Sequence, residues 1–109
     1  ITAAVRSFIE RHGDSRFSGF EQADAIRRDR AGWFEDTPDG RLYWFNGDGL
    51  REALKGFDFK RGLDVLEQAG VIPKAGPDGK RARLKRFAGH AVKVYPVNAT
   101  ALEEIEHGH

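Results

Sequence analysis

The chain has 109 residues, 39% of them hydrophobic and 32% charged, which suits one ordinary domain and excludes a membrane-spanning protein. Aromatic residues make up 11%, which argues against disorder, and the lack of cysteine excludes disulfides, zinc fingers and thiol catalysis. The net charge is +1, no apolar run reaches about 18 residues and no signal peptide is present, so we expect a cytoplasmic protein.

The N-terminal part of the chain predicts a helix over residues 2–12, because Val5, Phe8 and Ile9 have the spacing of one apolar helix face. A short helical turn is expected over residues 23–30. The chain begins at Ile1 and contains no Met, so we expect one domain, residues 1–109, excised from a larger protein.

A β-hairpin is expected next. Residues 32–35 and 41–45 are rich in the aromatic and branched side chains that favour strands. Residues 36–40, with Pro38 and Gly40, have the composition of a turn between them.

Two helices follow at residues 48–55 and 58–69, with Asp48 and Asp58 as their expected N-caps. Only a short link at Gly56 and Phe57 joins them, which is typical of a helix-turn-helix.

A second hairpin is expected over residues 81–87 and 91–97, and residues 98–109 are expected to form a short helix or a mobile tail. The predicted order is helix, β-hairpin, helix, helix, β-hairpin. This order predicts an α+β fold like a winged helix-turn-helix, with the second hairpin as the wing.

The near-zero net charge hides a strong segregation along the chain. Residues 1–72 carry a net charge of −2, residues 73–97 carry +6 and residues 98–109 carry −3. A basic hairpin can neutralise phosphates and release counterions, and four to six such contacts would give a salt slope of roughly −4 to −5. The residues predicted to bind nucleic acid are Lys80, Arg81, Arg83, Lys85, Arg86 and Lys93. The alternative is that these charges only protect an exposed strand edge from aggregation.

Two other features leave the function open. The second helix of the pair carries Lys60 and Arg61 beside Asp64 and Glu67, which favours a solvated face or a protein contact over base recognition. The aromatic cluster at residues 33–45 is expected to be mostly core. Strand alternation still leaves one of Trp33 and Phe34, and likewise one of Tyr43 and Trp44, able to face outward and stack on bases.

The sequence contains no recognisable catalytic, phosphate-binding or metal-binding motif. Residues 76–80 lack the spacing and following helix of a phosphate-binding loop and are expected to be a turn. The histidines have no metal-ligand spacing apart from His107 and His109, and the serines have no nucleophile motif. We therefore expect no enzyme activity, no cofactor, no metal and no small-molecule substrate for this chain.

Short segments at residues 8–17, 30–33, 56–58, 66–72 and 92–97 carry a family resemblance. In these segments the chain resembles the C-terminal region of a domain-of-unknown-function family of helicase-like or primase-like (superfamily II helicase-type) proteins of bacteria, phages and plasmids. The resemblance implies an accessory module, with the ATPase and its phosphate-binding loop in an upstream domain. No ATP-binding residue of the family can be carried over to this chain.

These observations predict a non-enzymatic module that binds DNA, including single-stranded DNA as an open alternative, through its basic second hairpin. The competing hypothesis is a protein–protein interaction module that docks on its own ATPase domain or on another replication or transfer factor.

Overall fold

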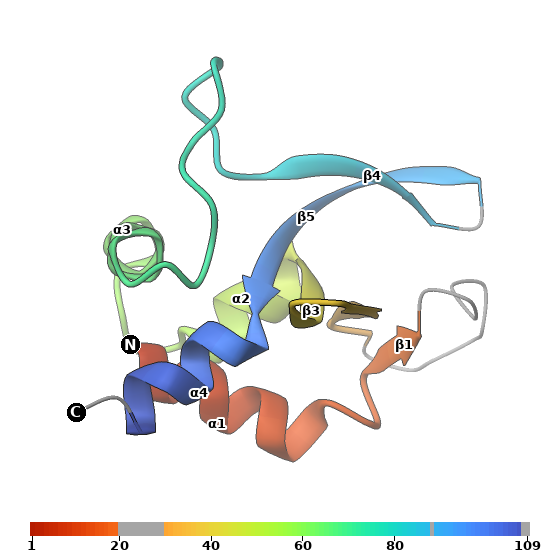
Figure 1. Cartoon of the computed structure of the whole chain (residues 1–109). Helices are drawn as coiled ribbons and strands as arrows, with labels where there is room; N and C mark the ends of the chain where they lie inside the picture. Colours follow the sequence, from red (N-terminus) through yellow and green to blue (C-terminus); the bar gives the residue numbers. More distant parts are fainter. Residues whose placement is uncertain (20–29, 88, 108–109) are drawn as a thin grey trace.

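The computed structural model describes residues 1–19, 30–87 and 89–107. The expected turn at 23–30 falls almost wholly outside these residues. The order of the elements is helix, three strands, two helices, two strands and a final helix (Figure 1). Their bounds are α1 Thr2–His12, β1 Phe17–Gly19, β2 Gly32–Thr37, β3 Gly40–Asn46, α2 Gly47–Ala53, α3 Phe59–Gln68, β4 Arg83–Phe87, β5 His90–Asn98 and α4 Ala99–His107.

The helices lie close to the positions that the sequence predicts, and their caps explain their limits. The Asp58 carboxylate accepts a hydrogen bond from the backbone N–H of Arg61, as expected for the N-cap of α3. The predicted cap of α2 was wrong. Asn46 caps that helix instead, because it ends β3 in an extended conformation and its side chain reaches the N–H of Gly49 at 2.7 Å.

Both predicted hairpins are present. In the first, β2 and β3 pair from Gly32 opposite Phe45 to Thr37 opposite Gly40, so the turn is shorter than expected and consists of Pro38 and Asp39. The C-terminal segment forms the helix α4 up to His107.

The winged helix-turn-helix prediction was wrong. All five strands form one mixed sheet in the order β1-β2-β3-β5-β4, with β1 parallel to β2. The second hairpin is therefore part of the main sheet, because β5 pairs with β3 from Leu42 opposite Asn98 to Asn46 opposite Val94. β5 can occupy this central position because it buries Val94 toward one sheet face and Val97 toward the other, both with no exposed surface.

One face of the sheet carries the main core. Tyr43 and Phe45 of β3 pack there with apolar side chains from all four helices. The rings of Phe8, Phe17 and Phe45 pack against one another in this core. Those of Phe17 and Phe45 meet edge to face, with their centroids 5.0 Å apart. Helices α1 and α4 lie side by side below the sheet in Figure 1.

The other face is concave, because the sheet curls until β4 touches β2. The rings of Trp33 and Phe87 stack at 3.9 Å with an interplanar angle of 7°, although two strands separate them in the sheet. A second contact joins the same two strands, because the Lys85 amino nitrogen of β4 lies 3.8 Å from a carboxylate oxygen of Glu35 in β2. The β4–β5 hairpin, seen as the curved arm in Figure 1, therefore presents only one face outward.

Candidate nucleic-acid interface

The six predicted binding residues all lie on the β4–β5 hairpin or directly before it, but they do not form one surface. Leu84 pairs with Lys93 and Arg86 pairs with Ala91, so Lys93 and Arg86 share the outward face. Arg83 and Lys85 alternate with them and point to the concave face. Strand alternation thus divides a basic segment that looks uniform in the sequence.

Arg81 belongs to an ion-pair network with α3. Its guanidinium donates to Glu67 at 3.0 Å and also contacts Asp64, and the Glu67 carboxylate accepts a further bond from the N–H of Ala75. The hydrogen bond from Arg81 lowers the pKa of Glu67, and the hydrogen bonds to Glu67 and Asp64 raise the pKa of Arg81. Asp64 and Glu67 of α3 therefore hold the loop that leads into β4.

Replacing Arg81 with Ala should lower the melting temperature at pH 7 by a few degrees. Because the pKa of Glu67 is lowered in the folded state, this stabilisation exists at neutral pH and is lost as the pH falls below the ordinary value of 4.5. Thermal unfolding of both proteins across this range should show the difference shrinking in acid. A difference that stays constant down to about pH 2 would contradict this role.

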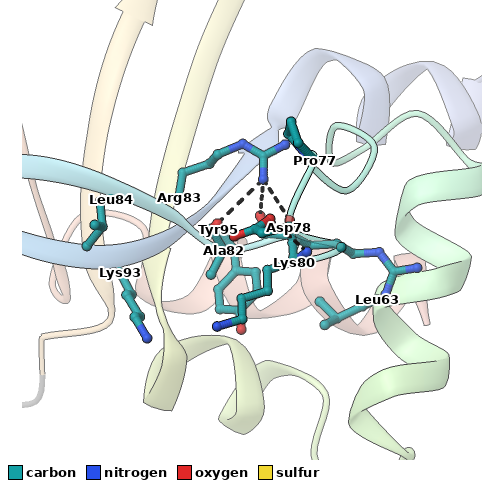
Figure 2. Close-up of a pocket in the computed structure, with 12 residues that line it drawn as sticks. Leu63, Pro77, Asp78, Lys80, Ala82, Arg83, Leu84, Lys93 and Tyr95 are labelled. Atoms are coloured by element: carbon teal, nitrogen blue, oxygen red, sulfur yellow. Dashed lines mark hydrogen bonds between the residues drawn. The ribbon is translucent and has the colours of Figure 1, made fainter.

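The Arg83 side chain is also held by hydrogen bonds within the protein. Its guanidinium donates to the carbonyl oxygen of Lys74 at 2.7 Å. It also donates to the carbonyl oxygen of Lys80 at 3.0 Å (Figure 2). Lys85 lies over the ring of Trp44, with its amino nitrogen 4.5 Å from the ring centroid. Arg83 therefore closes the loop before β4, and Lys85 covers part of an aromatic side chain.

The exposed cations of the predicted set are Lys80, Arg86 and Lys93. Among the described residues, no carboxylate lies within ion-pair distance of Lys80 or Lys93. Figure 2 shows Lys80, Lys93 and Tyr95 on the side of the hairpin opposite to the Arg83 guanidinium. We call the surface formed by Lys80, Arg86, Lys93 and Tyr95 the outward basic face.

A hollow of about 950 Å³ lies at this face, between the hairpin, the loop at residues 76–82 and Leu63 of α3. Lys80, Lys93 and Tyr95 contribute to its lining. Asp78 is the carboxylate in the lining, and it accepts a hydrogen bond from the backbone N–H of Lys80.

A second hollow of about 770 Å³ lies on the concave side, where β5 pairs with β3 along one edge but, among the described residues, has no strand along its other edge for a short stretch. β4 pairs with β5 only as far as Val94, and Asn98 donates its N–H to the carbonyl of Val71 at 2.9 Å. Pro96 lies in the gap, where its missing N–H leaves no unsatisfied donor. Trp44 and the loop residue Lys74 line this hollow. Lys74 is not among the six residues predicted from the sequence to bind nucleic acid.

Strand alternation resolves the question of the aromatic cluster. Tyr43 is only 8% exposed and belongs to the core, whereas Trp44 is half-buried and lines the second hollow. Trp33, Tyr43 and Phe45 are all buried, which confirms the prediction that the cluster is mostly core. Tyr95 was not expected at the site, and its position two residues after Lys93 was the signal that could have shown it.

The segment at residues 76–80 is a turn, as predicted. Gly79 donates its N–H to the carbonyl of Gly76 at 2.8 Å, and a strand follows rather than the helix that a phosphate-binding loop requires. Within the described ranges, no group of three His, Asp or Glu side chains could hold a metal ion.

Comparison with models of protein families gives no match, and comparison with curated proteins gives none either. In the part of the chain that the structure describes, no helix is both long enough and apolar enough to cross a membrane.

Proposed function

We propose that this domain is a non-enzymatic accessory module that binds the phosphate backbone of nucleic acid through the outward basic face. The observation that carries this proposal is the position of Arg86 and Lys93, which are exposed on one side of a hairpin whose other side is packed. Lys80, in the loop before the hairpin, lies on the same side as Lys93 (Figure 2). Exposed Lys and Arg side chains on one face contact phosphates without reading the sequence, because phosphates occur at every nucleotide.

The salt dependence of binding tests how many cations take part. Three contacts should give a slope of log affinity against log salt of about −2 to −3, shallower than six contacts would give. Fluorescence anisotropy of a labelled oligonucleotide, titrated with the full chain between about 50 and 200 mM salt, measures this slope. A slope near zero, or no binding at about 50 μM protein in low salt, would overturn the proposal.

A DNA partner and a helicase-like or primase-like parent protein remain proposals that rest on the resemblance described above. Docking on a protein partner is the weaker candidate. Its support is Leu84, which is 72% exposed on the outward basic face, but single exposed apolar side chains are common on protein surfaces.

A further inference from the structure

The two hollows lie on either side of the same strand. Both include Arg83 and Leu84 in their lining, so they meet at the start of β4, which is an edge strand of the sheet. A ligand long enough to pass around this edge can occupy both hollows at once.

Each hollow combines one aromatic side chain with at least one exposed lysine. In the first, Tyr95 lies with Lys80 and Lys93, and its ring is held edge-on by Phe59 at 5.9 Å. In the second, Trp44 lies with Lys74. Aromatic rings interleaved with cations are the usual composition of surfaces that stack bases and contact the linking phosphates.

The Trp44 ring is fixed in orientation before any ligand arrives. Its indole N–H donates to the Glu35 carboxylate at 3.2 Å, and Lys85 lies over one face of the ring, so a base would stack on the opposite face. A ring that is already ordered loses little conformational entropy when a base stacks on it, which favours binding.

We propose that the preferred ligand is single-stranded nucleic acid that passes around the start of β4, with one base on Tyr95 and another on Trp44. This inference rests on the function proposed above and adds the ligand class. A duplex cannot follow the path, because its persistence length is about 500 Å and it does not bend around a single strand edge. A single strand bends freely and exposes its bases for stacking.

The test compares a single-stranded oligothymidine of about 12 nucleotides with a mixed-sequence duplex of equal length, binding to the full chain. We expect the single strand to bind at least about 10-fold more tightly. Replacing Trp44 with Leu should weaken single-strand binding about 10-fold, a typical loss for one stacked base, and leave duplex binding unchanged. Trp44→Phe should restore most of the affinity.

Phe57→Leu is the matched control, because Phe57 is 48% exposed and lines neither hollow. It should bind both ligands as the wild type does. Tryptophan fluorescence of the wild type provides a second measurement that needs no variant. Trp33 is only 7% exposed, so quenching by the single strand would report on Trp44.

The outcomes separate the two proposals. Single-strand preference with a loss at Trp44→Leu, or quenching by the single strand alone, supports the path around β4. Equal affinity for both ligands overturns the path around β4, as does an unchanged single-strand affinity of the Trp44→Leu variant together with no quenching. Either result still agrees with phosphate binding by the outward basic face. No binding of either ligand overturns the proposed function itself.

Discussion

Reversing the charge of Lys80, Arg86 and Lys93 to Glu is expected to weaken nucleic-acid binding by about 100- to 500-fold at 0.1 M salt. The estimate follows from counterion release, since each lost phosphate contact removes roughly 0.7 to 0.9 from the salt slope. The remaining slope should be close to zero. Anisotropy titrations of the triple variant and the wild type at several salt concentrations measure both quantities.

A control with the same change in net charge separates local contacts from the general field of the protein. Arg11, Lys55 and Arg61 are exposed and line neither hollow, so their reversal to Glu should cost less than about fivefold. At 0.1 M salt the Debye length of about 10 Å screens such distant charges. Equal losses in the two triple variants would contradict an interface at the outward basic face.

Replacing Phe45 with Ala is expected to lower the free energy of unfolding by about 4 kcal/mol. Phe45 is completely buried, and its ring contacts Phe8 and Phe17 where β3 meets the helices. The truncation leaves a cavity bounded by rigid rings that cannot collapse to fill it. A domain of this size has a total stability of roughly 5–15 kcal/mol, so the substitution should remove a large part of it.

Urea denaturation followed by circular dichroism measures this change. Phe45→Leu retains much of the volume and should cost about 1 kcal/mol. Phe57→Ala, at a half-exposed position, should change stability by less than about 0.5 kcal/mol. A loss below about 1 kcal/mol for Phe45→Ala would contradict the central place of this ring in the core.

The local structure of the chain was largely predictable. The apolar spacing around Phe8 indicates a helix over residues 2–12, and the Asp58 cap and the two hairpins also follow from short-range patterns. The cap of α2 was assigned two residues too late. Asn46 lies in neither predicted element, although it ends β3 and caps α2.

The site was predictable as a segment but not as a surface. The excess of Lys and Arg over residues 73–97 directs attention to the second hairpin as the candidate site. Which cations remain exposed depends on partners far along the chain. Arg81 meets Asp64 and Glu67 of α3, and Lys85 meets Trp44 of β3. No spacing rule in a single sequence gives these pairs.

The helices, the hairpins and the basic segment follow from the sequence alone, because they depend on periodicity, turn residues and composition over short stretches of the chain. The pairing of β5 with β3, the parallel strand β1 and the curl of the sheet that stacks Phe87 on Trp33 arise only in the folded domain. Strand pairing joins segments that are distant in the chain, and the burial of whole sheet faces selects which strands pair. For this reason the second hairpin forms one edge of the sheet instead of a free wing, and one hollow lies on each side of β4.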